Sequence, residues 1–119
     1  MFSFFKPKAN KMNVRKVDDM FAVTGQITPE QVKAVADAGF RSIVCARPDD
    51  EEPGQPGFDT VARAAQAEGI QIVHIPVSGG LGEGQIIRFH DAWDKMPKPI
   101  LGYCRSGARA GSLYATLKR

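Results

Sequence analysis

Residues 99–110 read Pro-Ile-Leu-Gly-Tyr-Cys-Arg-Ser-Gly-Ala-Arg-Ala, and this stretch decides the fold. The short apolar run 99–102 predicts a strand, and the segment that ends near Leu117 predicts a helix directly after it. Cys104 therefore lies in a tight strand-to-helix loop. Free backbone N–H groups and the positive end of a helix dipole meet in such a loop, and they favour a thiolate and a bound anion.

The residues around Cys104 strengthen this interpretation. Arg105 and Arg109 add two positive charges, and Gly107 lets the backbone turn closely enough for its amides to point inward. Ser106, Gly107 and Ala108 would supply amides and room to a substrate. Cys45 differs, because it lies inside the apolar run 42–46 with no glycine or arginine loop beside it, which predicts a core residue.

Strand-like and helix-like segments alternate along the rest of the chain. Strands are predicted at 20–23, 42–46 and 70–75, the last of them covered on both faces. Helices are predicted between Thr28 and Gly39, over 58–67 and over 86–93. We therefore expect an α/β fold with a mainly parallel sheet of four to five strands flanked by helices. Ligands of such sheets bind at the carboxyl ends of the strands, where Cys104 falls.

Composition limits the possible functions. The 119 residues, 43% of them hydrophobic, suit one domain, predicted over 15–119 after an N-terminal extension, 1–14. A formal charge of +3, with no helix-turn-helix or zinc spacing, argues against a nucleic-acid partner. Two cysteines in different surroundings do not form a secreted disulfide framework, so we expect a cytoplasmic protein. No apolar stretch predicts a membrane span, and no pattern predicts a metal or another cofactor.

Four segments together carry a resemblance to a known family: 21–26, 39–52, 74–77 and 103–109. They resemble the bacterial beta-lactamase hydrolase-like family, also called DUF442, over roughly residue 15 to the end. The resemblance implies a fold like that of dual-specificity, cysteine-dependent phosphatases. It also implies an association with rhodanese-type sulfur transfer as well as with phosphatases. Some members are joined to a metallo-hydrolase-like persulfide dioxygenase, which makes such an enzyme an expected partner.

Two features favour sulfur transfer over phosphatase chemistry. Four residues separate Cys104 from Arg109, as in rhodaneses, whereas cysteine phosphatases have one more. A smaller cradle should leave fewer inward amides for a phosphoryl group. Dual-specificity phosphatases also carry a general acid just after the third strand, where this chain has Val77, Ser78 and Gly79. Ala110 replaces the Ser or Thr that usually follows the phosphatase arginine.

The resulting prediction is a sulfurtransferase that works through a Cys104 persulfide. Its partners would be a small-molecule sulfur donor, thiosulfate or a persulfide, and a thiol acceptor or cyanide. Arg109 would hold the anionic end of the donor, and Arg105 would lower the thiol pKa or screen incoming anions. Arg47 and the acidic run 49–52 are expected at the same edge, where they would shape the pocket or form a solvated loop. His74 and His90 are expected in or beside the core. A cysteine-dependent tyrosine or dual-specificity phosphatase is the first alternative, and a non-catalytic domain that binds an anion or a partner is the second.

Overall fold

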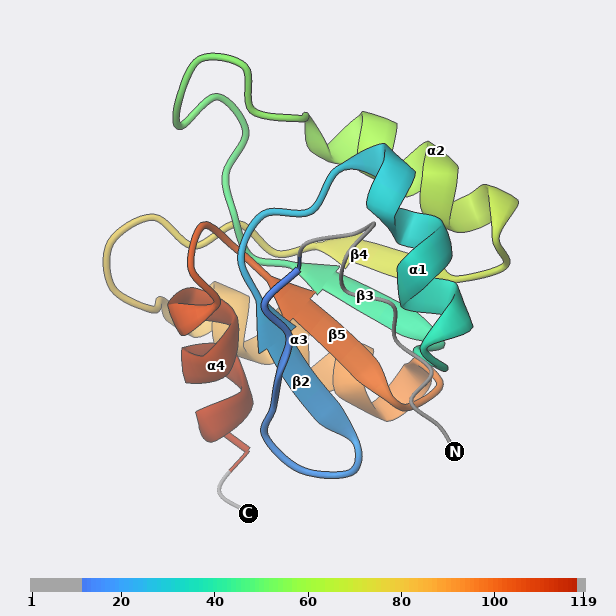
Figure 1. The fold of residues 1–119 in the computed structure, drawn as a ribbon. Helices are drawn as coiled ribbons and strands as arrows, with labels where there is room; N and C mark the ends of the chain where they lie inside the picture. The colour runs from blue at the N-terminus through green and yellow to red at the C-terminus, as the bar shows by residue number, and fades with distance from the viewer. Residues whose placement is uncertain (1–11, 118–119) are drawn as a thin grey trace.

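The computed structural model describes residues 12–117. Its elements are β1 (Arg15–Lys16), β2 (Phe21–Thr24), the 3₁₀ helix η1 (Pro29–Gln31), α1 (Val32–Asp37), β3 (Ser42–Cys45), α2 (Phe58–Ala67), β4 (Gln71–His74), α3 (Glu83–Lys95), β5 (Ile100–Tyr103) and α4 (Ala108–Ala115) (Figure 1). The strands form one sheet in the order β1-β2-β5-β3-β4, in which only β1 is antiparallel to its neighbour. The predicted α/β fold with a mainly parallel sheet is confirmed.

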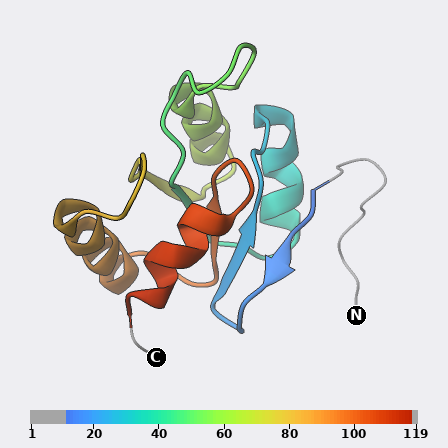
Figure 2. The same cartoon turned by 90° about the vertical axis from the view of Figure 1, so that its left-hand side faces the viewer.

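Helices cover both faces of this sheet. Helices α3 and α4 lie on one face, and α1 and α2 lie on the other (Figure 1 and Figure 2). Successive strand residues point to opposite faces, so each central strand contributes to two cores. In β2, Phe21 and Val23 pack with α3 and α4, while Ala22 packs with α1 and α2. This double burial explains why the central strands are continuous apolar runs.

Strand β5 lies at the centre of the sheet and is buried along its whole length. Gly102 in this strand allows α4 to come close. A Cβ atom at this position would lie 2.8 Å from Phe21 Cζ and 2.9 Å from Ala110 Cβ. The absence of a side chain at Gly102 therefore sets the distance between β5 and the helix that follows it, and so shapes the loop between them.

The turn residues act as the sequence predicts at the start and end of the first helical segment. The Thr28 N–H donates to Gln31 Oε1 at 2.9 Å, which is half of a reciprocal capping box, and Pro29 opens the helix. Gly39 follows the helix with a φ of 101°, a left-handed conformation that favours glycine. The helical segment spans 29–37 as predicted, but its first turn is the 3₁₀ helix η1 and only 32–37 are α-helical.

Two strands differ from the sequence prediction. β1 was not predicted, because Arg15 and Lys16 are exposed and polar. β4 was predicted to be covered on both faces, but it lies at the edge of the sheet, with Gln71 exposed and the rest only partly buried. Residues 1–11 of the predicted N-terminal extension lie outside the described part of the chain. Of its last residues, Met12 is buried and Val14 packs against the α1–α2 core.

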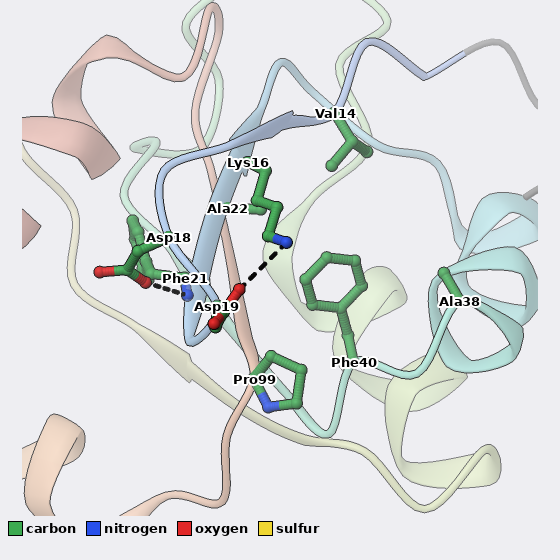
Figure 3. A pocket seen from close by; sticks show the side chains of 9 residues that line it. All are labelled: Val14, Lys16, Asp18, Asp19, Phe21, Ala22, Ala38, Phe40 and Pro99. Carbon is green, nitrogen blue, oxygen red and sulfur yellow. Dashed lines mark hydrogen bonds and ion pairs between the residues drawn. The ribbon is translucent and has the colours of Figure 1, made fainter. Parts of the chain in front are cut away.

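A pocket of about 360 Å³ lies beside β1 at the amino ends of the parallel strands (Figure 3). Phe21 and Pro99 line it at the strand starts, with Phe40 opposite, and Lys16 pairs with Asp19 at its rim. Cys104 follows the other end of β5, so this pocket is separate from the predicted reactive loop. Within residues 12–117, no helix has both the length and the apolar character needed to cross a membrane.

Candidate active site

Cys104 lies at the centre of a cradle formed by the loop between β5 and α4. The residue is fully buried, and the Gly107 N–H donates to its Sγ at 3.1 Å. Gly107 has a φ of 98° and stands directly before the first residue of α4. A residue with a side chain rarely adopts that conformation, so glycine is what turns this amide toward the sulfur.

The surroundings of Cys104 favour the thiolate. Burial by itself raises the pKa of the thiol, but backbone N–H groups of the loop and of α4 act against it, and the net pKa is lowered. Those groups belong to Ala110, Ser106, Arg109 and Gly107. A thiolate at a helix amino terminus with converging amides is a nucleophile adapted to anionic substrates.

Residues from the start of the chain support the outer wall of the cradle. The Arg15 guanidinium donates from Nη2 to the Ser106 carbonyl at 3.1 Å. A Cβ atom at Gly107 would lie 2.8 Å from that same nitrogen, and one at Gly25 would lie 2.8 Å from the Arg105 carbonyl oxygen. The loop is therefore held between β1 and the turn after β2. Sequence reasoning missed Arg15 and Gly25, since neither forms a motif with Cys104.

Arg109 uses both terminal nitrogens of its guanidinium on other loops. Nη1 and Nη2 donate to Glu51 Oε2 and Oε1 at 2.7 and 2.9 Å, and Nη1 also donates to the Val77 carbonyl at 2.8 Å. The pKa of Arg109 is raised, first by Glu51 and to a lesser extent by the Cys104 sulfur. Glu51 and the Val77 carbonyl therefore hold the Arg109 guanidinium in one orientation.

Arg47 connects the two glutamates that meet the cradle arginines. Its side chain is only 3% exposed, and it pairs with Glu51 Oε1 at 2.8 Å and Glu52 Oε1 at 2.6 Å. Nη1 donates to Gln26 Oε1 at 3.0 Å. Glu52 in turn lies 3.7 Å from Arg105 Nε. The charges therefore alternate in a charge chain: Arg105, Glu52, Arg47, Glu51, Arg109.

This charge chain determines the ionisation of its acids. Hydrogen bonds from Arg109 and then Arg47 lower the pKa of Glu51 to about 2, and Arg47 and Arg105 also lower the pKa of Glu52. Sequence analysis placed Arg47 at this edge of the sheet. In the structure Glu51 contacts both Arg47 and Arg109. Sequence analysis also placed the acidic run 49–52 at this edge, but it did not predict that Glu51 pairs with Arg109.

The remaining predicted site residues lie around the cradle mouth. Arg105 points outward, with 72% of its side chain exposed. Ser106 and Ala108 are exposed, and the Ser106 hydroxyl accepts the Ala108 N–H at 3.2 Å, which satisfies a free donor at the start of α4. Within residues 12–117, no group of three or more His, Cys, Asp or Glu side chains could hold a metal ion.

Cys45 and the two histidines form contacts that support the fold and that do not involve Cys104. Cys45 is buried in the α1–α2 core, and burial raises its pKa to about 11. Its Sγ and His74 Nε2 both form hydrogen bonds to the Arg47 carbonyl, at 3.5 and 2.8 Å. His74 also stacks on Phe58. These contacts anchor the start of the loop that carries Glu51. His90 Nε2 and Thr116 Oγ1 form a hydrogen bond at 2.8 Å.

Solved structures with this architecture include phosphatases. A putative phosphatase from Neisseria meningitidis is 28% identical, with a TM-score of 0.81, and the match covers 91% of this chain and 78% of that one. A putative phosphatase of the DUF442 group from Shewanella putrefaciens has a TM-score of 0.72 at 17% identity, covering 86% of this chain and 64% of that one. The similarity to the Shewanella putrefaciens structure concerns the fold alone.

Curated relatives are much longer than this chain. The beta-lactamase hydrolase-like protein of Agrobacterium fabrum is 36% identical over 104 residues, which is 87% of this chain and 24% of that protein. The protein of the same name from Xylella fastidiosa strain Temecula1 is 36% identical over 105 residues, with the same coverage. The chain thus spans about a quarter of the length of these relatives, and a partner enzyme joined to it stays a prediction.

The prediction of a sulfurtransferase is wrong, because the matches are to phosphatase-like proteins. The prediction relied on the four-residue spacing between Cys104 and Arg109, which we expected to remove inward amides. In the structure the Gly107 N–H still donates to Cys104 Sγ at 3.1 Å, and further backbone N–H groups of the loop and of α4 lower the pKa of the thiol. The shorter loop therefore keeps amides that face the sulfur, and the alternative of a phosphatase is favoured.

The family described as beta-lactamase hydrolase-like protein, phosphatase-like domain, matches residues 13–118. This match covers nearly the whole chain and contains the cradle, the charge chain and every strand of the sheet. The chain therefore belongs to the beta-lactamase hydrolase-like family, of which it is a phosphatase-like domain.

Proposed function

We propose that this domain is a cysteine-dependent phosphatase. The Cys104 thiolate attacks the phosphorus of a bound phosphoryl group, and the bond to the leaving oxygen breaks, which forms a phosphocysteine. Water then attacks the phosphorus, the S–P bond breaks, and its electron pair returns to Cys104 Sγ. The proton that water loses leaves with the released phosphate.

The observation that carries this proposal is the orientation of backbone amides around Cys104. The Gly107 N–H lies 3.1 Å from Sγ, and three further amides of the loop and helix help to lower the pKa of the thiol. Amides that converge on a thiolate also face the oxygens of a phosphoryl group attached to it, so the same groups activate the nucleophile and hold its substrate.

Arg109 supplies the positive charge for the transferred group. Glu51 fixes two of its nitrogens, so the guanidinium keeps its orientation when the site is empty. Positioned donors of this kind stabilise the charge of the transition state without reorganisation. Arg105 lies at the mouth of the cradle with most of its side chain exposed, so it can contact an incoming anion.

Hydrolysis of p-nitrophenyl phosphate tests the proposal. We expect steady release of p-nitrophenol by the wild-type chain and none above background by Cys104→Ser. After acid quenching during turnover, intact mass should show one phosphoryl group, and peptide mapping should place it on Cys104.

The outcome that would contradict a phosphatase is equally specific. Vanadate binding without turnover would indicate the non-catalytic alternative, and turnover retained in Cys104→Ser would show that another group performs the chemistry. Cys45→Ser serves as the matched control, because Cys45 faces the opposite core and should leave turnover unchanged.

A further inference from the structure

The acidic residues at the catalytic edge of the sheet come from one loop and from the first turns of three helices. The turns 24–28, 76–82 and 104–107, which surround Cys104, contain no aspartate or glutamate. The loop after β3 contains a run of four, 49–52, and Glu30, Asp59 and Glu83 stand in the first turns of η1, α2 and α3. Any proton donated by a carboxyl group of this edge to a leaving group must come from these seven.

Three of the seven carboxylates are already engaged. Glu51 accepts both terminal nitrogens of Arg109 and Nε of Arg47, at 2.7 to 2.9 Å. Glu52 accepts Nη2 of Arg47 at 2.6 Å. Guanidinium groups thus lower the pKa of both glutamates, which stay ionised and have no proton to give. Asp49 Oδ1 accepts the Phe58 N–H at the start of α2, at 2.8 Å, which directs this carboxylate to the helix.

The other four carboxylates, Asp50, Glu83, Glu30 and Asp59, are exposed. Asp50 adopts a left-handed conformation in its loop, with a φ of 63°, and Glu83 is the first residue of α3. Positive charges stand in and against the cradle loop itself. Arg105 follows Cys104 directly and is largely exposed, and Arg15 donates to the Ser106 carbonyl. The mouth of the cradle is therefore suited to an anion that leaves, and poorly suited to an alkoxide that needs a proton.

We propose, on the basis of the phosphatase function proposed above, that this site accepts phosphoryl groups whose leaving group is a stable anion. Phosphoanhydrides fit best, aryl phosphates follow, and alkyl phosphates are excluded. In the first step the Cys104 sulfur forms a bond to phosphorus while the P–O bond breaks. The electron pair of that bond stays on the leaving oxygen, which departs unprotonated past Arg105. In the second step water takes the place of the leaving group, as described above.

A comparison of kcat/KM across leaving groups tests this inference. The probes are inorganic pyrophosphate, p-nitrophenyl phosphate, phenyl phosphate and O-phosphoserine. The ratio kcat/KM reports phosphoryl transfer to Cys104 even where hydrolysis of the intermediate limits kcat. General acids typically contribute about 10²–10⁴-fold, so O-phosphoserine should fall below p-nitrophenyl phosphate by at least roughly 100-fold, with phenyl phosphate between them.

Two failures of this experiment are distinguishable. If O-phosphoserine and p-nitrophenyl phosphate are cleaved within tenfold of each other by a Cys104-dependent reaction, the leaving-group proposal is overturned and the phosphatase stands. If no probe is cleaved above the Cys104→Ser background, the phosphatase proposal fails, and the leaving-group proposal fails with it.

Variants of the carboxylates show whether one of them is a hidden acid. Glu51→Gln should lower kcat/KM for p-nitrophenyl phosphate and phenyl phosphate by the same factor. The variant weakens the support of Arg109 and does not remove a proton donor. Asp50→Asn, Glu83→Gln, Glu30→Gln and Asp59→Asn should each leave the ratio of the two substrates unchanged. A variant that slows phenyl phosphate at least tenfold more than p-nitrophenyl phosphate would identify an acid and overturn the proposal.

Discussion

At the scale of single residues, the two cysteines show how environment decides chemistry. Cys45 and Cys104 are both buried, and burial raises the pKa of each thiol. Only Cys104 has converging backbone amides, and these reverse the shift. Cys45 instead points into the opposite core. Cys45 ends β3 and Cys104 follows the neighbouring strand β5, and the two side chains lie on opposite sides of the sheet, so only the Cys104 thiol has a lowered pKa.

We expect the two thiols to titrate in different pH ranges. Absorbance at 240 nm, which reports thiolate, should rise with a midpoint below the ordinary cysteine pKa of 9.0 and again near 11. Cys104→Ser should remove the lower transition, and Cys45→Ser should remove the upper one. A lower transition that survives in Cys104→Ser would contradict the assignment of the reactive thiol.

At the scale of elements, the unit of β5, cradle and α4 depends on the close packing of strand and helix. Gly102 lies where α4 crosses the strand, and a methyl group there would overlap Phe21 and Ala110. Phe21 is itself fixed by stacking on Tyr114 of α4, with ring centroids 4.3 Å apart. The position of the loop therefore follows from the distance between these two elements.

Gly102→Ala should destabilise the protein because the added Cβ would lie 2.8 and 2.9 Å from its neighbours. Overpacking of this kind costs about 1–3 kcal/mol. The measurement is the free energy of unfolding in urea. The matched control is Gly111→Ala, in α4 with nothing within 4 Å of the new Cβ, which should stabilise by about 0.5–1 kcal/mol. Equal effects at both sites would refute close packing at Gly102.

The loop between β3 and α2 depends on Arg47 in the same way. Arg47→Leu removes a guanidinium that is almost fully buried and leaves Glu51 and Glu52, which are 28% and 48% exposed, without it. We expect a loss of roughly 1–3 kcal/mol, less than for a fully buried pair because water reaches the glutamates. Lys33→Ala, which breaks an exposed ion pair with Asp37, is the control and should cost under about 1 kcal/mol. Urea unfolding of each variant measures the two losses in free energy of unfolding.

At the scale of the whole molecule, the charge chain and its hydrogen bonds join the loops that follow four strands. Gln26 lies after β2, Arg47 and Glu51 after β3, Val77 after β4 and Arg109 after β5, and hydrogen bonds or ion pairs connect them in a series. Arg15 adds β1 through the Ser106 carbonyl. The cradle is therefore part of the same network that holds the catalytic edge of the sheet together.

This network predicts how stability depends on acidity. The pKa of Glu51 is lowered from 4.5 to about 2 in the folded chain, so its contribution is present above pH 4.5 and is lost as pH falls toward 2. Thermal unfolding midpoints should decrease across that window. Glu51→Gln should start lower at neutral pH and decrease less across it. The same slope in wild type and variant would show that Glu51 does not carry this contribution.

Much of the fold could be predicted from local sequence. Runs such as 42–46 and 99–102 show buried strands, and Thr28, Pro29 and Gly39 mark helix ends, because these signals depend on backbone conformation and nearby side chains. β1 and the edge position of β4 could not be predicted in this way. Both follow from which strands become neighbours, and strand order is decided by contacts between distant parts of the chain.

The features of the candidate site also separate into those predicted from local sequence and those decided by tertiary contacts. By itself the sequence determined the position of the candidate nucleophile, of the glycine turn and of both cradle arginines, because strand, loop and helix are consecutive and place Cys104 at a helix amino terminus. Only the tertiary structure decided that Glu51 holds Arg109 across 58 residues and that Arg15 reaches Ser106 across 91. An arginine pairs with whichever carboxylate or carbonyl the sheet brings near it, and that choice depends on strand order, which no local pattern contains.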